Sequence, residues 1–235
     1  GGMYARTLDW HDFRIKYATT IRNSPEDGIS SISFSDHFVG RHGGINDQGL
    51  VVGTHSIPHY LEPWVPGVAY NISTRWILDH CKNVREAVEY LKTIPHVRGN
   101  MFLLADKKGE CARVETSSED VVVIFAEDGF LDATNHYQAP VMDKYVNLEM
   151  HLPVLENSRS RHEKMRNWTH EHEGTITLQR AIEFLSAHEE GLCNHLKYEG
   201  FSIRTLWSWI HFTDSKEVWL TEGAPCEKQF RKVNF

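Results

Sequence analysis

The 235-residue sequence has no long apolar run. No window approaches the roughly 20 consecutive apolar residues that a membrane-spanning helix needs. The N-terminus also lacks the basic start and the apolar stretch of a secretory signal peptide. We therefore expect a cytoplasmic protein with no membrane partner.

Clustered positive charge is missing as well. The chain has 25 Lys and Arg residues against 32 Asp and Glu residues, which gives a formal net charge of -7 at pH 7. Affinity for a phosphate backbone comes from clustered Lys and Arg side chains that release counterions, and no basic stripe runs through this sequence. We expect no nucleic-acid partner.

Cysteine is scarce and scattered. The absence of any CxxC pair disfavours both a disulfide framework and a zinc knuckle; the four cysteines are Cys81, Cys111, Cys193 and Cys226. The 15 histidines invite a metal hypothesis, with His170 and His172, or His11 and Asp12, as conceivable ligands. Such pairs are a weak signal without a helical HExxH pattern or neighbouring cysteines. The sequence therefore predicts no metal and no cofactor.

The composition that remains is that of an ordinary globular protein, with 40% apolar and 24% charged residues. There is no internal repeat, no low-complexity tract and no linker rich in Pro or Ser. Domains commonly hold roughly 100–200 residues, and β-rich ones often exceed this. We expect residues 1–235 to form a single domain, and the sequence leaves open whether it forms homo-oligomers.

The periodicity of apolar residues alternates between strand and helix along the chain. Short runs rich in β-branched and aromatic residues predict strands over 3–10, 14–21, 29–35 and 50–57, with a tight turn over 43–50. Helical spacing predicts helices over 72–81 and 84–91, the second capped by Asn83 with Glu86.

Strand character returns at 100–105, 111–116 and 121–126, followed by helices over 158–168 and 178–185 and a closing hairpin over 205–212 and 217–220. Two sheets stacked face to face, with a pair of helices outside each, would bury all these apolar faces. The predicted fold is α+β, a four-layer αββα sandwich of two antiparallel sheets flanked by helix pairs.

Polar residues gather at two predicted strands. In the first strand, period-two alternation places Arg6 with Leu8 on one face and Asp9 on the other, where it is expected to point inward. Segment 132–137 follows a strand and contains Asn135, an amide of the kind that donates to a developing oxyanion. The alternatives are a surface ion pair for Asp9 and a turn-forming Asn135 beside a solvated His136.

Two further segments could carry chemistry. Ser158 is expected to cap a helix, and either Arg159 or Arg161 could clamp a carboxylate. Cys193 lies two residues from His195, and a Cys–His pair can activate a thiolate. One hypothesis for the function is therefore an enzyme that uses this pair or a histidine-bound metal.

Taken in order, these segments resemble the isopenicillin-N (penicillin) acyltransferase-like family of N-terminal nucleophile (Ntn) hydrolases, related to choloylglycine hydrolase. The first strand is similar to the family pattern G-R-N-x-D-W/F, and the turn at 45–50 is similar to G-x-N-x-x-G-L. Five further segments resemble family patterns: residues 134–137 resemble T-N-H-F, 158–161 S-x-x-R, 193–195 C-R-H, 205–208 T-x-x-S and 223–226 G-x-P-C.

The resemblance implies a linear-amide C–N hydrolase or an acyltransferase. In such enzymes an N-terminal Cys, freed by self-cleavage, attacks an amide carbonyl with its own α-amino group as the base, and a thioester forms. The substrate would be a small-molecule amide or acyl compound. Carried over by position, Asp9 would hold the amine and Arg6 would support Asp9, Asn135 would line the oxyanion hole, and Arg161 would orient the nucleophile or bind substrate.

Three weaker assignments follow from the same resemblance, all of them substrate-binding: His55 and Ser56 at the end of the fourth predicted strand, and His136. The chain also departs from the family. Thr7 stands where the pattern has Asn, and no cysteine precedes Cys81. We therefore expect either a nucleophile supplied by a preceding segment or a non-catalytic relative that binds an acylated or peptide-like ligand, so whether this chain is an enzyme stays open.

Overall fold

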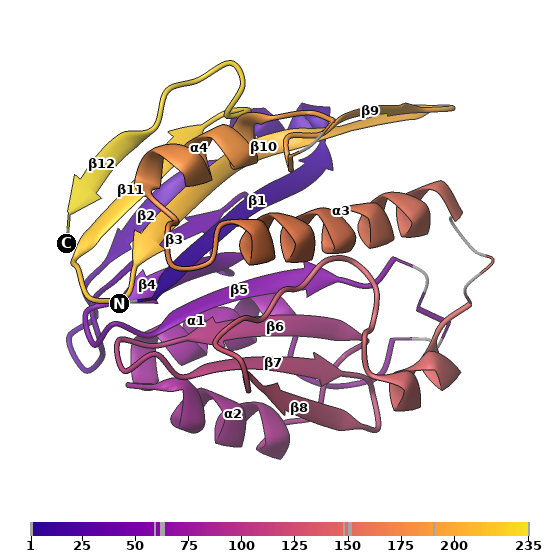
Figure 1. Cartoon of the computed structure of the whole chain (residues 1–235). Helices are drawn as coiled ribbons and strands as arrows, with labels where there is room; N and C mark the ends of the chain where they lie inside the picture. Colours follow the sequence, from indigo (N-terminus) through magenta and orange to yellow (C-terminus); the bar gives the residue numbers. More distant parts are fainter. Residues whose placement is uncertain are drawn as a thin grey trace.

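The computed structural model describes residues 2–58, 60–61, 64–147, 149, 152–189 and 191–234 (Figure 1). Its elements are, in order, β1 (Met3–His11), η1 (Asp12–Tyr17), β2 (Thr19–Asn23), β3 (Ser31–Ser35), β4 (Gly43–Asn46), β5 (Val51–Ser56), α1 (Tyr70–His80), α2 (Val84–Thr93), β6 (Asn100–Ala105), β7 (Cys111–Thr116), β8 (Val121–Phe125), η2 (Pro140–Tyr145), α3 (Leu152–Glu171), α4 (Leu178–Ser186), β9 (His195–Tyr198), β10 (Phe201–Phe212), β11 (Glu217–Glu222) and β12 (Arg231–Asn234).

The strands form two antiparallel sheets. Sheet A has the order β1-β10-β11-β12, and β9 also pairs with β10. Sheet B contains β2 to β8 in sequence order, since each strand pairs with the next along the chain. The first and last parts of the chain therefore build sheet A together, and the middle builds sheet B.

Aromatic residues fill the layer between the sheets. Trp209 of β10 is fully buried, and its ring lies 5.0 Å from the rings of both Tyr4 in β1 and Phe34 in β3. Leu8 and Ile32 extend this cluster along the same two strands. The core shared by the two sheets thus joins residues from both ends of the chain.

Helices cover the outer faces. Ile77 of α1 and Leu91 of α2 pack with Phe102 against sheet B, and Asn83 caps α2 by accepting a hydrogen bond from the Glu86 amide at 3.0 Å. On sheet A, Phe184 of α4 packs in a cluster with Ile210 of β10 and with Met165 and Trp168 of α3. The predicted αββα order of layers is confirmed.

Two predicted boundaries are wrong for physical reasons. The strand predicted over 14–21 begins too early, since residues 12–17 form the 3₁₀ helix η1 and β2 starts at Thr19. None of the residues of η1 is buried, so their period-two pattern has no sheet face to meet. Residues 43–46 form β4 in place of part of a turn. A side chain at Gly44 would meet the Ile32 carbonyl at 2.5 Å, so glycine allows the two strands to pair there.

Ser158 does not cap a helix. The helix α3 begins at Leu152, so Ser158 lies inside it and is fully buried. The short strands β9 and β12 were not predicted, because their sequences HLKY and RKVN are too polar to read as strands. No helix in the described part of the chain is long and apolar enough to cross a membrane.

The first strand has an open edge. β1 pairs with β10 along its whole length, and no other described strand pairs with it. The register between β1 and β10 shifts between Leu8 and Asp9, which marks a β-bulge. Bulges re-aim side chains next to functional sites. The extra residue here is Leu206 of β10, and the shift places Thr205 opposite Asp9.

Candidate active site

A cavity of about 290 Å³ runs along the open edge of β1. Every residue from Met3 to Trp10 lines it, so both faces of the strand contribute. Thr54, His55 and Ser56 of β5 form part of the wall, together with residues 129–133 and 135 of the loop after β8. Arg161, Met165 and Trp168 of α3 and Phe184 of α4 complete it. The cavity therefore separates the end of β1 from sheet B and α3.

Asp9 is held by two neutral donors at one end of this cavity. The Asn194 side-chain amide donates to Oδ2 at 2.6 Å, and the Thr205 hydroxyl donates to Oδ1 at 2.6 Å. Among the described residues, no Lys, Arg or His nitrogen lies within ion-pair distance of this carboxylate. Asp9 is thus fixed in position with its negative charge unpaired.

Arg161 lies near this carboxylate without touching it. Its Nε donates to Asn157 Oδ1 at 2.8 Å, and one terminal nitrogen donates to Asn135 Oδ1 at 2.8 Å. Burial lowers the pKa of Arg161, while the charge of Asp9 acts in the opposite direction. The two amides hold the guanidinium at the cavity wall, where it remains a cation because an arginine pKa is so high.

Asn135 connects α3 to the end of β5. Its Nδ2 donates to the Ser56 carbonyl at 2.9 Å, and its backbone N–H donates to Ser158 Oγ at 2.7 Å. A side-chain amide carries two N–H donors. One of them binds the Ser56 carbonyl, and Asn135 also lines the cavity.

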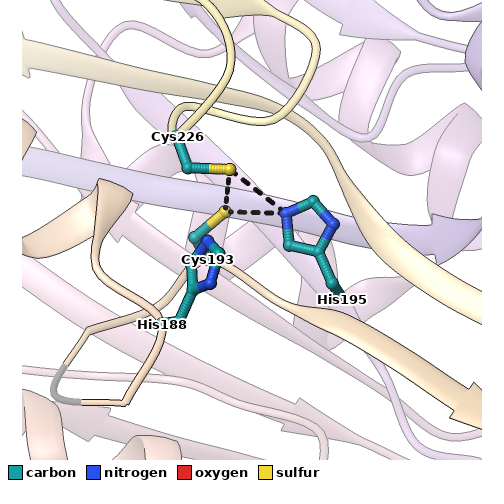
Figure 2. Close-up of side chains that lie close together, drawn as sticks. All are labelled: His188, Cys193, His195 and Cys226. Atoms are coloured by element: carbon teal, nitrogen blue, oxygen red, sulfur yellow. Dashed lines mark hydrogen bonds between the residues drawn. The ribbon is translucent and has the colours of Figure 1, made fainter.

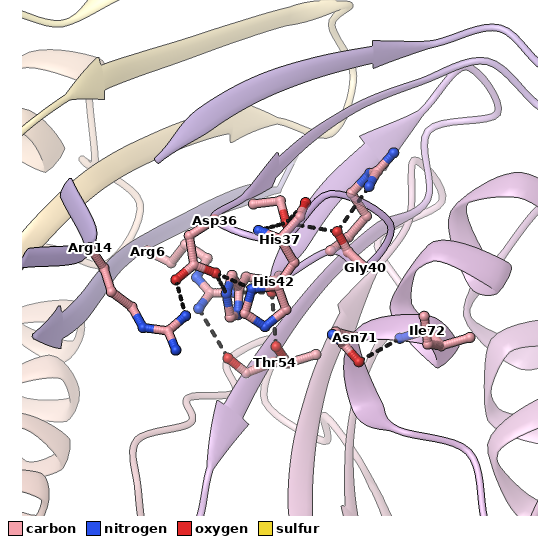
Figure 3. A network of polar contacts seen from close by, with 11 residues as sticks. Arg6, Arg14, Asp36, His37, Gly40, His42, Thr54, Asn71 and Ile72 are labelled. Atoms are coloured by element: carbon pink, nitrogen blue, oxygen red, sulfur yellow. Dashed lines mark hydrogen bonds and ion pairs between the residues drawn. The ribbon is translucent and has the colours of Figure 1, made fainter. Parts of the chain in front are cut away.

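Arg6 points to the opposite face of β1, as the alternation predicts. It is buried, and its two terminal nitrogens donate to the carbonyls of His42 at 2.9 Å and Thr54 at 3.0 Å (Figure 3). A side chain at Gly53 would meet the Arg6 guanidinium at 2.6 Å, which explains the glycine on β5. Arg6 therefore ties sheet A to sheet B, and it acts on Asp9 through its charge alone.

The three predicted substrate-binding residues are not all together. His55 and Ser56 line the cavity, and His55 Nε2 is buried without a hydrogen-bond partner among the described residues. Burial, followed by the charges of Arg6 and Arg161, lowers the pKa of His55 well below its usual value, so the ring is neutral. His136 instead contacts Ser158 Oγ at 2.8 Å and borders a separate, smaller hollow.

Three residues of the site were not assigned from the sequence. Asn194 and Thr205 hold Asp9, and Asn157 donates to Asn194 Oδ1 at 3.3 Å while it accepts from Arg161. Both Asn194 and Thr205 lie in segments that resemble family patterns, residues 193–195 and 205–208. A half-buried carboxylate such as Asp9 needs hydrogen-bond donors, but this requirement does not indicate where in the sequence the donors lie.

Cys193 and His195 do not form a nucleophile pair in this cavity. Neither residue lines it, and Cys193 Sγ lies 3.6 Å from His195 Nε2 and 3.5 Å from Cys226 Sγ (Figure 2). Burial raises the pKa of Cys193 to about 12, which keeps the thiol protonated at neutral pH. The geometry gives no support to the alternative reading in which Cys193 attacks a substrate.

The fold is that of several solved hydrolases. A variant of conjugated bile acid hydrolase from Clostridium perfringens superimposes with a TM-score of 0.71 at 14% identity, over 99% of this chain and 88% of that one. Penicillin V acylase from Agrobacterium tumefaciens gives a TM-score of 0.65 at 16% identity, over 99% and 82% of the two chains.

An N-acylethanolamine-hydrolyzing acid amidase orthologue from Caenorhabditis elegans gives a TM-score of 0.57 at 10% identity, over 91% of this chain and 88% of that chain. No curated protein matches the sequence significantly. The sequence does match one family model, from residue 1 to residue 227, and this confirms the resemblance drawn from its motifs. The chain belongs to the acyl-coenzyme A:6-aminopenicillanic acid acyl-transferase family.

Proposed function

We propose that this protein cleaves a small-molecule amide, or transfers its acyl group, through a thioester on an N-terminal cysteine carried by a segment that precedes Gly1. The observation that carries the proposal is the cavity along the open edge of β1, with Asp9 at one end. Family membership supports the reaction class. The cavity geometry supports the location of the nucleophile.

An extended segment fits this cavity for a simple geometric reason. The free edge of β1 offers unpaired N–H and C=O groups to a neighbouring strand about 4.8 Å away. A strand joined to the start of β1 by a short hairpin runs antiparallel to it. Its first residue would therefore lie beside the last residues of β1, next to Asp9.

The unpaired charge of Asp9 suits an α-amino group at that position. Such an amine titrates near about 7.7–8.0, so it can accept the thiol proton at working pH. The thiolate sulfur then bonds to the amide carbonyl carbon, the C–N bond breaks, and the leaving amine takes up that proton. Water or a second amine next attacks the thioester and releases the thiol.

One donor at the cavity suits the oxyanion of this reaction. The second N–H of Asn135 Nδ2 can point to the carbonyl oxygen, and the neutral ring of His55 lines the same cavity. Arg161 adds a fixed positive charge. Preorganised donors of this kind commonly contribute about 10²–10³-fold in kcat each.

The apolar lining indicates the acyl side of the substrate. Leu131 of the loop after β8 lines the cavity together with Met165 and Trp168 of α3. Contact with these side chains favours an apolar acyl chain or ring. The substrate class that we propose is a small amide with an apolar acyl group, such as an acylated amine or amino acid.

The test uses the chain together with its natural upstream coding sequence. Incubation with acylated amines should release the amine, and mass spectrometry after acid quenching should find one acyl group on the first residue of the mature protein. Replacement of that first cysteine by alanine should abolish both signals. Cys81→Ala is the matched control, because Cys81 is buried beneath α1 and α2, outside the cavity, and its loss should leave turnover intact.

Two results would count against the proposal. One is an upstream sequence without a cysteine before β1. The other is a natural chain that acylated ligands stabilise in thermal unfolding but that never releases amine, and this second result would support a non-catalytic, ligand-binding relative.

A further inference from the structure

Four metal-binding side chains converge outside the cavity, at the beginning of β9 (Figure 2). His188 belongs to the loop after α4, Cys193 and His195 come at the start of β9, and Cys226 belongs to the loop between β11 and β12. Cys193 is buried, whereas the other three are exposed. Three separate parts of the chain therefore present two thiols and two imidazoles to one point near the surface.

The three distances among Cys193, His195 and Cys226 are close to the edges of a tetrahedral zinc site. Cys193 Sγ lies 3.5 Å from Cys226 Sγ and 3.6 Å from His195 Nε2, and Cys226 Sγ lies 3.2 Å from His195 Nε2. The ligand atoms of all four residues lie within 4.8 Å of one another. Zinc bonds of about 2.3 Å to sulfur and about 2.0–2.1 Å to nitrogen imply edges of roughly 3.3–3.8 Å for a tetrahedron.

We propose that His188, Cys193, His195 and Cys226 form a structural zinc site. Two thiolates and two imidazoles are a standard closed donor set for Zn²⁺, which prefers four-coordinate tetrahedral geometry. Binding replaces the two S–H bonds by two Zn–S bonds and releases two protons to solvent. The two thiolates then balance the charge of the ion, so the completed site is neutral.

The backbone around the ligands is already fixed. The Cys193 amide donates to the Ala187 carbonyl at 3.0 Å, which holds the loop between α4 and β9 in a turn. On the other side, the Glu227 amide donates to the Ala224 carbonyl at 2.9 Å and forms a turn around Cys226. Ser186 Oγ donates to the Pro225 carbonyl at 3.3 Å and links the two loops directly. Little reorganisation is needed for an ion to bind.

The site also adjoins the residues that hold Asp9. Asn194, which donates to Asp9, lies between the two ligands Cys193 and His195. An ion at this point would fasten the loop that carries Asn194 to the loop after β11. The zinc site stands independently of the proposed reaction, since its geometry requires no nucleophile and no substrate.

Metal content is the first measurement. The chain, produced in zinc-supplemented medium and purified with a thiol reductant and without chelator, should contain close to one zinc per molecule by plasma mass spectrometry. Replacement of zinc by Co²⁺ should give the intense visible bands of a tetrahedral site together with thiolate-to-metal charge transfer in the near ultraviolet.

Ligand variants give the second measurement. Cys226→Ser and His188→Ala both change exposed side chains, so the fold should survive, as circular dichroism would verify. Each should weaken zinc binding by at least about tenfold. Even the loss of a residue that only hydrogen-bonds to a metal ligand lowers metal affinity by about 10–100-fold. Cys111→Ser and His170→Ala, which change the same residue types away from the cluster, should bind zinc as the unchanged chain does.

Three results would overturn the proposal. The first is a folded chain that holds no zinc and gives only the weak spectrum of octahedral Co²⁺. The second is a Cys193–Cys226 disulfide in protein purified without reductant, combined with no metal uptake after its reduction. The third is unchanged zinc affinity in both ligand variants.

Discussion

Asp9 and Asp36 are two carboxylates in neighbouring parts of the molecule with opposite surroundings. Asp36 follows β3, its side chain is 1% exposed, and it contacts Arg14 at 2.6 Å, His42 at 2.6 Å and His37 at 2.5 Å (Figure 3). Within the described ranges, Asp9 receives hydrogen bonds from the uncharged side chains of Asn194 and Thr205 alone. One carboxylate has its cation in place, and the other does not.

The difference separates a structural charge from a charge that is available for chemistry. Burial alone would raise the pKa of Asp36, but the hydrogen bonds from His42 and Arg14 outweigh it and hold that pKa well below its usual range. Arg14, His37 and His42 already surround this carboxylate. Asp9 has an open cavity beside it, so a positively charged ligand group can still reach it.

The largest expected effect is on catalysis through Asp9. Asp9→Asn keeps the hydrogen-bonding shape but removes the charge that would hold the nucleophile's amine. We expect kcat/KM for amide cleavage to fall by about 10²–10⁴-fold, the range for a lost acid–base contribution, while the melting temperature changes little. Asp27→Asn, at an exposed carboxylate, is the control. A tenfold loss or less would place the amine elsewhere.

The next effect is on stability through Asp36. Asp36→Asn leaves Arg14 without its anion, and loss of a charge-assisted hydrogen bond at this partly buried site costs about 1.5–3 kcal/mol. Urea unfolding should show this fall in the free energy of unfolding. Since Asp36 does not line the cavity, the folded variant should retain its affinity for acylated ligands. Equal stability of the Asp36 and Asp9 variants would remove the distinction between the two carboxylates.

A smaller effect is expected at the neutral donors of Asp9. Thr205→Val keeps the shape of a fully buried side chain but removes its hydroxyl. That hydroxyl donates to Asp9 and accepts from the backbone N–H of Asn194. Leaving a buried polar group unsatisfied costs about 1–3 kcal/mol. Thermal unfolding should show the lower stability. The value of kcat/KM should also fall at temperatures where the variant is still fully folded. Thr221→Val, a buried threonine of β11 outside the cavity, is the matched control.

The sequence predicts Asp9 itself far better than its partners. A carboxylate at an alternating strand position, within a family pattern, identifies Asp9 and its face of β1. Its donors Asn194 and Thr205 lie 185 and 196 residues away, and only the folded chain brings them together. The four residues of the proposed zinc site come from three separate parts of the chain, whereas spacing rules recognise ligands that are close in sequence.

Burial also decides where local pattern misleads. The alternation of residues 14–17 resembles the start of a strand, yet none of these side chains is buried, and they form part of the 3₁₀ helix η1. Ser158 resembles a helix cap, yet buried Leu155 extends α3 towards its N-terminus and places Ser158 inside the helix. Secondary-structure propensity decides neither case. Tertiary contacts determine which residues of such a segment are buried, and burial determines the structure that forms.

The smallest expected effect concerns two buried histidines. His42 Nε2 contacts the Asp36 carboxylate, whereas His55 Nε2 has no hydrogen-bond partner among the described residues. Burial lowers the pKa of His55 well below the usual value of about 6.5. The unfolded chain therefore binds the proton more readily, and stability present above pH 6.5 is lost as the pH falls below it, by at most about 1.4 kcal/mol per pH unit. His55→Gln should reduce this slope in urea unfolding between pH 7 and pH 5, whereas His170→Ala should leave it unchanged. An equal slope in both variants would mean that a substrate-like group or water already pairs with His55.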